Sequence, residues 1–89
     1  MMTEFQLFAT EGCTLCEVAE AMLVDLLGRH PQLASQLSIA YVDIAESEAM
    51  VDAYGLSIPV LAHSALELRW PFTQDEALDF LRRTSASEP

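Results

Sequence analysis

The sequence predicts a small α/β domain with a four-stranded mixed sheet and three helices, in the order β-α-β-α-β-β-α. Hydrophobic residues make up 52% of the 89 residues and charged residues 20%, a balance that supports a packed core and argues against intrinsic disorder. Segments with the two-residue period of a strand alternate with segments that have the period of a helix. Strands separated by a helix are expected to pair in parallel, whereas the last two, joined by a short turn, are expected to be antiparallel.

The first half of the chain holds two predicted strands and the longest predicted helix. Residues 4–9 alternate between apolar and polar side chains, which indicates a strand. Apolar side chains then recur at helical spacing over residues 15–27, and Gly28 and Pro31 are expected to end this helix. Residues 37–44 are rich in β-branched and aromatic side chains, so we expect a strand that is buried on both faces.

The second half holds a short helix, two strands and a closing helix. Residues 46–54 predict the short helix, and Gly55 follows it at the position where a left-handed cap is common. Residues 58–62 and 66–70 predict the two strands of a hairpin. The sequence TQDE at residues 73–76 is a capping box, in which a Thr and a Glu three positions apart satisfy the first backbone N–H groups of a helix.

The chain is expected to form one domain. We assign residues 1–83 to this domain and the polar residues 84–89 to a flexible C-terminal tail. The N-terminus lacks the basic and apolar regions of a secretory signal, and no stretch reaches the roughly 18 apolar residues of a membrane span. Two cysteines are too few for a disulfide-stapled secreted scaffold. We therefore expect a cytoplasmic protein, in which a pair of cysteines needs a chemical explanation.

The charge balance is strongly acidic. Fourteen Asp and Glu residues oppose four Lys and Arg, which gives a formal net charge of -10. The chain has no lysine, and its cations are Arg29, Arg69, Arg82 and Arg83. A nucleic-acid partner or an anionic membrane surface requires a basic footprint, so neither is expected. The charge favours instead a partner with a basic face, through steering that weakens as salt is raised.

The chemistry of the chain is concentrated in Cys13-Thr14-Leu15-Cys16, directly after the first strand and at the start of the first helix. Residues three apart in a helix share a face, so the two sulfurs can reach bonding distance. Cys13 lies at the helix N-terminus, where unsatisfied N–H groups and the helix dipole favour the nucleophilic thiolate. Cys16 lies one turn inside and suits the role of resolving the mixed disulfide that Cys13 forms.

Three other interpretations of the cysteine pair are open: two inert buried thiols, a zinc site, or an iron–sulfur cluster shared between two chains. Zinc needs four ligands, and the only histidines are His30 and His63. His30 lies past most of a helix, roughly 20–25 Å from Cys13 at 1.5 Å per residue, which disfavours a self-contained zinc site. We expect His63 to be exposed near the hairpin turn.

The helix dipole and the neighbouring carboxylates have opposite effects on a thiolate at Cys13. The helix dipole contributes on the order of 0.3–1 kcal/mol towards a thiolate at Cys13. Glu11 and Glu17 are close in sequence, and a carboxylate about 4 Å away in water opposes the thiolate by roughly 1 kcal/mol. The two effects nearly cancel, so we expect only a modest activation of Cys13.

Three segments resemble the glutaredoxin branch of the thioredoxin fold, and more narrowly the short glutaredoxin-like proteins of bacteria. They are FATEGCTLC at residues 8–16, YVDI at residues 41–44 and YGLSIPVL at residues 54–61. The resemblance covers roughly residues 5–81 and implies a minimal thioredoxin, glutaredoxin-like fold. A CxxC motif followed about forty residues later by a hydrophobic-Pro pair at the start of a strand is considerably more specific than CxxC alone.

The resemblance also implies roles for individual residues. In that family the proline that matches Pro59 is cis and lies beside the redox cysteines, and the backbone of the residue that matches Ile58 pairs with the substrate chain or glutathione. We therefore assign substrate binding to Ile58 and Pro59, together with Thr14 and Leu15 between the cysteines. It implies a disulfide-containing protein or glutathione as substrate, and a reductant protein or glutathione as electron donor.

Several positions depart from the family pattern. Typical glutaredoxins carry CPYC with a basic residue just upstream, whereas Glu11 occupies that place here. They also carry a Gly-Gly pair and an acidic residue after the last strand, where backbone amides hold a glutathione carboxylate. Residues 69–73 (RWPFT) contain no glycine, and Gly12 stands where classical thioredoxins have tryptophan. The acidic Glu11 and the missing glycine pair weigh against glutathione binding.

The sequence thus predicts a thiol–disulfide oxidoreductase with Cys13 as nucleophile and Cys16 as resolving cysteine. This mechanism requires no metal or organic cofactor, and glutathione enters only as a co-substrate. The alternative, from another class, is a non-catalytic thioredoxin-fold binding module or an iron–sulfur carrier. Visible absorbance would identify the cluster, whereas turnover of a disulfide substrate would identify the enzyme.

Overall fold

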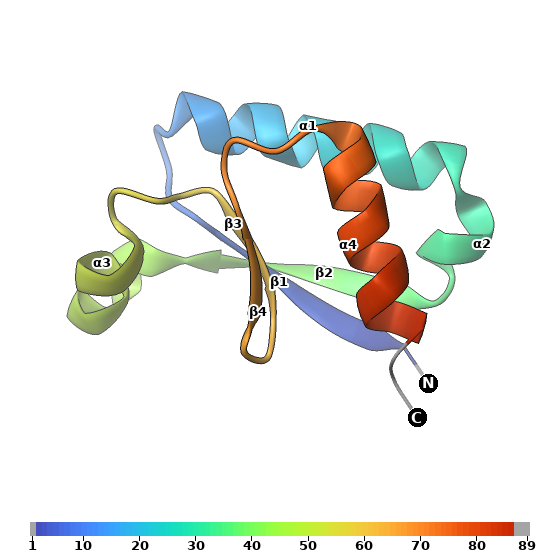
Figure 1. Ribbon diagram of the computed structural model, residues 1–89. Helices are drawn as coiled ribbons and strands as arrows, with labels where there is room; N and C mark the ends of the chain where they lie inside the picture. Colours follow the sequence, from blue (N-terminus) through green and yellow to red (C-terminus); the bar gives the residue numbers. More distant parts are fainter. Residues whose placement is uncertain (1, 87–89) are drawn as a thin grey trace.

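The computed structural model describes residues 2–86 and shows a four-stranded sheet with helices packed against it (Figure 1). The strands are β1 (Thr3–Ala9), β2 (Leu37–Asp43), β3 (Val60–His63) and β4 (Leu66–Arg69). The helices are α1 (Thr14–Arg29), α2 (Pro31–Ala34), α3 (Glu48–Tyr54) and α4 (Gln74–Ala86), with the 3-10 helix η1 (Ile44–Glu46) before α3. The predicted fold class is confirmed. Within the described residues, no helix is both long and apolar enough to span a membrane.

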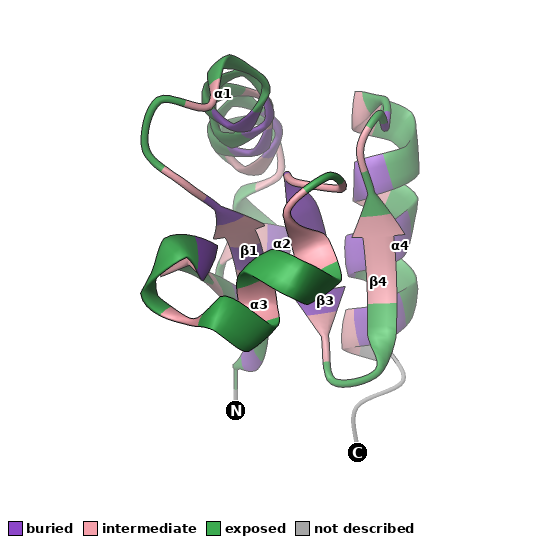
Figure 2. Ribbon diagram, turned by 90° about the vertical axis from the view of Figure 1, so that its left-hand side faces the viewer, coloured by how far each residue is buried: buried purple, intermediate pink, exposed green. Residues whose placement is uncertain are grey.

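The sheet has the strand order β2-β1-β3-β4. β1 pairs in parallel with β2, and β3 pairs antiparallel with both β1 and β4, as the element order predicts. Phe8 near the end of β1 lies opposite Val60 at the start of β3. Figures 1 and 2 show α3 at the end of the sheet where β1 and β2 finish. The β1–α1 and α3–β3 connections therefore lie at the same end of the molecule.

The core lies between the sheet and the helices α1 and α4, whose buried faces turn towards the strands (Figure 2). Phe5 and Leu61 on the two central strands and Leu81 on α4 are 0% exposed. Each such side chain contributes roughly 1.5–3 kcal/mol on burial. Ala9 at the end of β1 and Cys16 in the first turn of α1 are also buried, which fixes the start of α1 against the sheet.

The ends of α1 and α4 are set by local hydrogen bonds. The capping box of α4 is confirmed: the Thr73 N–H donates to Glu76 Oε1 at 2.9 Å, and the Glu76 N–H donates to Thr73 Oγ1 at 3.1 Å. α1 runs through Gly28 to Arg29, and Pro31 begins the additional helix α2 instead of only ending α1. α4 continues to Ala86, so the predicted tail is wrong at its start, where Thr84 is buried in the helix. Residues 87–89 of that tail lie outside the described residues.

The expectation that β2 is buried on both faces is wrong. β2 is an edge strand, and its exposed positions include Ser38, Ala40 and Tyr41. Tyr41 is 49% exposed. The apolar run in β2 reflects strand propensity and one covered face, because α1 packs on only one side of this edge.

Two further expectations are corrected. Gly55 has φ −52° in the right-handed region, so it is not a left-handed cap. A Cβ at Gly55 would lie 2.6 Å from the Val51 carbonyl oxygen, and this close approach is what requires glycine there. His63 is half-buried, because its Nδ1 lies 2.8 Å from the Glu4 carbonyl oxygen and its ring lies 5.4 Å from that of Phe5.

Candidate functional site

Cys13 and Cys16 form a disulfide at the start of α1. Cys13 is the N-cap residue of this helix, and Gly12, with φ +79°, makes the turn that leads into it. The Cα atoms of the two cysteines are 5.2 Å apart, within the usual range for a disulfide. The Cys16 N–H donates to Cys13 Sγ at 3.1 Å. The predicted proximity of the two sulfurs is therefore confirmed.

The two sulfurs differ in their access to solvent. Cys16 is 3% exposed and packs among the buried residues of α1, whereas Cys13 is half-buried. Cys13 is therefore the more exposed residue of the pair. The backbone N–H that points at the Cys13 sulfur can also stabilise a negative charge on it when the disulfide is reduced.

The loop that precedes β3 lies beside the end of β1. Because Phe8 pairs with Val60, Pro59 lies next to the last residues of β1, four positions before Cys13. The Ile58–Pro59 peptide bond is cis, and the Pro59 carbonyl accepts a hydrogen bond from the Trp70 N–H at 3.1 Å. The Ile58 N–H already donates to the Tyr54 carbonyl at 3.1 Å, so an incoming chain meets a donor that is engaged within the molecule.

Exposed apolar side chains are found on the segments next to the disulfide. Leu15, between the cysteines, is 50% exposed, and Leu56, three residues before Pro59, is fully exposed. Thr14 is exposed as well. Leu15 and Val18 were part of the apolar stripe predicted for α1, but both are about half exposed because they lie beside the buried stripe that includes Cys16 and Ala19.

Acidic side chains surround the other flank of the disulfide. Cys16 contributes to a pocket of about 500 Å³ that Glu11, Glu17 and Glu20 also line. Tyr41 closes this pocket, and its pKa is raised by partial desolvation and further by the nearby carboxylates, Glu11 and Glu20 among them. The pocket is therefore a region of negative potential.

A polar network connects this end of the molecule to β4, and no local pattern in the sequence predicts it. The Tyr54 hydroxyl donates to Glu67 Oε2 at 2.5 Å, and the Arg69 guanidinium donates to Glu67 Oε1 at 3.0 Å and to Ser57 Oγ at 2.8 Å. The Arg69 guanidinium also lies over the Tyr54 ring, 5.4 Å from its centroid. The network thus joins the last turn of α3, the loop before the cis proline and β4.

The hydrogen bonds of this network shift the pKa of two of its members. The bond from Tyr54 lowers the pKa of the Glu67 carboxyl below its ordinary value of 4.5, although partial burial opposes the shift. The same bond raises the pKa of Tyr54 above 10.0. Both groups are therefore held in the protonation states that make the bond, an anionic carboxylate and a neutral phenol.

Neither histidine approaches the cysteines in a way that would build a metal site. Among the described residues, no group of three or more His, Cys, Asp or Glu side chains is arranged to hold a metal ion. His30 lies between α1 and α2, at the far end of α1, and His63 lies at the end of β3.

A family model described as "Glutaredoxin-like domain (DUF836)" matches residues 4–82. The chain belongs to this family. The match spans the CxxC motif, the cis-proline loop and most of α4, so this glutaredoxin-like domain includes every residue of the candidate site. The resemblance inferred from the sequence is confirmed. A search of curated proteins gives no match.

Solved structures share the fold of this glutaredoxin-like domain. Target protein XcR50 from X. campestris is 29% identical, with a TM-score of 0.66 over 89% of this chain and 96% of that one. The germline-specific thioredoxin Deadhead from Drosophila melanogaster is 15% identical, with a TM-score of 0.59 over 90% of this chain and 78% of that one. Human ERp44 is 15% identical, with a TM-score of 0.60 over 97% of this chain and 28% of that one. The two more distant similarities concern the fold alone.

Proposed function

We propose that this glutaredoxin-like domain is a thiol–disulfide oxidoreductase in which Cys13 is the nucleophile and Cys16 the resolving cysteine. The observation that carries the proposal is the asymmetry of the disulfide. The more exposed cysteine, Cys13, is the N-cap of α1 and accepts a backbone hydrogen bond, while Cys16 is buried one turn later. An accessible, helix-capping cysteine is the one that attacks in such pairs, because its thiolate is stabilised and reachable.

The reaction is a two-electron exchange. In the reduced protein, the Cys13 thiolate attacks one sulfur of a substrate disulfide, which forms a mixed disulfide and releases one substrate thiolate that takes up a proton. Cys16 then loses its proton and attacks the Cys13 sulfur, which re-forms the Cys13–Cys16 disulfide and releases the second substrate thiol. The substrate gains two electrons and two protons, and a thiol reductant returns the same number to the protein.

The surface around Cys13 favours a polypeptide substrate. Leu15 and Leu56 offer exposed apolar contacts, and the carboxylates of the adjacent pocket offer negative charge to a basic segment. Thr14, Ile58 and Pro59 complete the proposed contact surface. The engaged N–H of Ile58 leaves its carbonyl as the proposed main-chain partner for a substrate. We propose a reducing compartment such as the cytoplasm, where the dithiol form is regenerated by a reductant protein in preference to anionic glutathione.

Single-cysteine variants test the assignment. With insulin as a generic disulfide substrate, Cys13→Ser is expected to abolish reduction, because the attacking sulfur is gone. Cys16→Ser is expected to accumulate a mixed disulfide on Cys13, which mass spectrometry detects as the added mass of the substrate chain. Thioredoxin reductase and glutathione are supplied separately as electron donors, so that the same assay identifies the reductant.

The matched control is the pair of variants itself, since each removes one sulfur and breaks the same disulfide. Circular dichroism of both variants checks that the fold is retained. Full turnover by Cys13→Ser, or trapping on Cys16 instead of Cys13, would overturn the assignment of roles. An absence of turnover in the wild type with both donors would overturn the enzymatic proposal, and visible absorbance of the purified protein would then identify a cluster carrier.

A further inference from the structure

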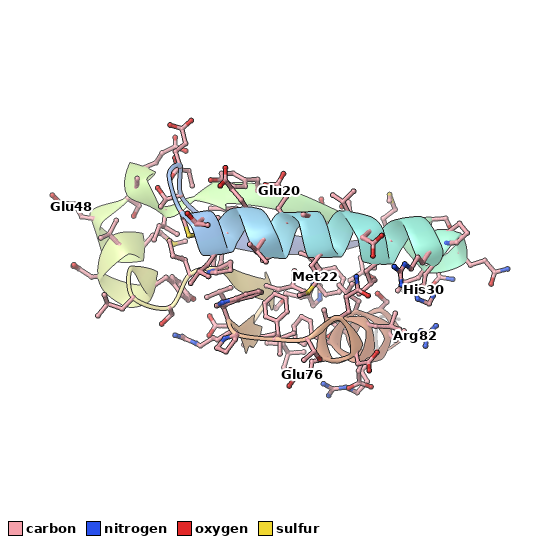
Figure 3. All side chains as sticks on the ribbon, turned by 90° about the horizontal axis from the view of Figure 1, so that it is seen from above. Glu20, Met22, His30, Glu48, Glu76 and Arg82 are labelled. Atoms are coloured by element: carbon pink, nitrogen blue, oxygen red, sulfur yellow. A yellow bond between two sulfur atoms is a disulfide. The ribbon has the colours of Figure 1, made fainter. Side chains whose placement is uncertain are left out.

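A second pocket lies at the opposite end of α1 from the disulfide. It has a volume of about 580 Å³ and opens between the α1–α2 corner and the last turns of α4. Figure 3 shows His30 and Arg82 reaching towards this region from the two sides. Its lining residues are Arg29, His30, Pro31, Gln32, Leu33, Gln36, Arg82 and Ser85.

The pocket gathers positive charge in a chain that has little of it. Two of the four arginines, Arg29 and Arg82, line it, and among the described residues no Asp or Glu does. Within the described part of the chain, Arg82 makes no ion pair, whereas its neighbour Arg83 binds Asp79 at 2.7 Å. Arg29 is paired with Asp25 at 3.2 Å, but both side chains are more than half exposed, so this pair is weak and solvent-screened.

Hydrogen-bonding groups accompany the arginines. The side-chain amides of Gln32 and Gln36 and the ring of His30 add further hydrogen-bonding groups to the lining. The Ser85 hydroxyl is buried without a hydrogen-bond partner, an arrangement that native structures usually avoid. A group that accepts hydrogen bonds in this pocket would meet the guanidinium of Arg82 and could satisfy this hydroxyl after a rotation of its side chain.

The helix ends that border the pocket oppose an anion only weakly. Backbone carbonyls at the end of a helix carry partial negative charge when they are unpaired. Here the corner carbonyls are engaged: Leu27 accepts from the His30 N–H, His30 from the Ala34 N–H, and Pro31 from the Ser35 N–H. The carbonyls of the α1–α2 corner therefore add little negative charge to offset the Arg82 guanidinium, while the charge of Arg29 is shared with Asp25.

We propose that this pocket is a binding site for a small oxyanion, a molecule that carries a phosphate or carboxylate group. Guanidinium groups present parallel N–H donors that match the oxygens of either group, and such charge-assisted bonds are the stronger ones. The site is about one helix length from the disulfide, so it is separate from the proposed redox site. The test of this proposal does not depend on the proposed oxidoreductase activity, because it measures anion binding.

Amide chemical shifts of the ¹⁵N-labelled full chain test the proposal, with inorganic phosphate and succinate titrated separately at constant ionic strength. Saturable shifts confined to residues 29–36 and 82–85 are expected with at least one of the two anions. Phosphate alone would identify a phosphate site, and succinate alone a carboxylate site. Shifts that never saturate, or that spread evenly over the protein, would overturn the proposal.

Two neighbouring arginines provide a matched pair of variants. Arg82→Gln and Arg83→Gln remove the same charge from the same exposed helix end, but only Arg82 lines the pocket. Arg82→Gln is expected to weaken anion binding by at least about tenfold, which corresponds to about 1.4 kcal/mol. Arg83→Gln is expected to weaken it by less than about threefold, through the general loss of charge. Equal weakening by both variants would contradict a built site, because it would show that only net charge matters.

Discussion

Replacing Tyr54 with phenylalanine removes one hydroxyl and leaves the ring contacts in place. The ring keeps its packing against Phe8, at 4.7 Å between centroids, and its position under the Arg69 guanidinium. The variant therefore isolates the hydrogen bond to Glu67. A hydrogen bond to a charged group contributes about 1.5–3 kcal/mol. Because the Glu67 side chain is 24% exposed and keeps its bond to Arg69, we expect a loss at or below the lower limit of this range, about 1–1.5 kcal/mol.

Urea unfolding of the oxidised protein, followed by circular dichroism, measures this loss. In thermal unfolding of a domain of this size, a loss of 1 kcal/mol corresponds to a decrease in melting temperature of roughly 4–8 °C. A double-mutant cycle with Glu67→Gln is expected to give a coupling free energy of about 1 kcal/mol. Tyr41→Phe is the control, since that hydroxyl belongs to a ring that is about half exposed, and it should change stability by less than about 0.5 kcal/mol.

The pH dependence of the Tyr54→Phe effect follows from the two pKa shifts. The lowered pKa of Glu67 stabilises the fold at pH values above its ordinary pKa of 4.5, and this contribution is lost as the pH falls through the folded value. The raised pKa of Tyr54 gives a contribution that is complete below pH 10.0 and is lost as the pH rises through the folded value. The difference between wild type and variant should therefore be greatest near neutral pH. A difference in the free energy of unfolding between wild type and Tyr54→Phe that stays constant down to pH 2 would refute this account. Effects of Tyr54→Phe and Glu67→Gln that add within about 0.3 kcal/mol would refute it as well.

Three other predictions concern the glycines, Arg69 and the disulfide. Gly55→Ala is expected to destabilise the protein by about 1–3 kcal/mol, because the added Cβ would meet the Val51 carbonyl. Gly28→Ala should instead stabilise α1 by about 0.5–1 kcal/mol, since nothing lies within 4 Å of the added Cβ. Thermal unfolding of both variants measures this contrast. Arg69→Gln removes the hydrogen bond from the Arg69 guanidinium to Ser57 Oγ in the loop before Pro59. The variant is expected to raise the KM for a protein disulfide several-fold at an unchanged kcat. Reduction of the disulfide should lower stability by at most about 2 kcal/mol, as measured by urea unfolding with and without reductant, because the bond closes a very short loop.

Local signals in the sequence were sufficient for most of the fold. The capping box at Thr73 and Glu76, the CxxC motif and the alternation in β1 each depend on residues within a few positions of one another, and each lies where it was expected. The parallel and antiparallel pairings also follow from the length of the connections. Element boundaries were less certain, because Pro31 begins a helix as readily as it ends one.

The remaining features depend on contacts between distant parts of the chain. The strand order leaves β2 at an edge, and nothing in its own composition distinguishes an edge strand from a central one. His63 is held by Glu4, 59 positions away, and Tyr54 is paired with Glu67 across two turns and a strand. The need for glycine at position 55 arises from one backbone oxygen, a steric cause that the residue type alone does not reveal.

Most of the arginines lie away from the disulfide, where Arg29 and Arg83 are paired with carboxylates. Three of the four, Arg29, Arg82 and Arg83, lie at the ends of α1 and α4, away from the disulfide, while the carboxylates of the Cys16 pocket lie at the other end. A positively charged partner that diffuses towards the protein would therefore exert a torque that turns the disulfide end to face it before contact. Correct orientation on approach would raise the association rate without any new contact in the bound complex, and the gain would decrease as a rising ionic strength screens the charges.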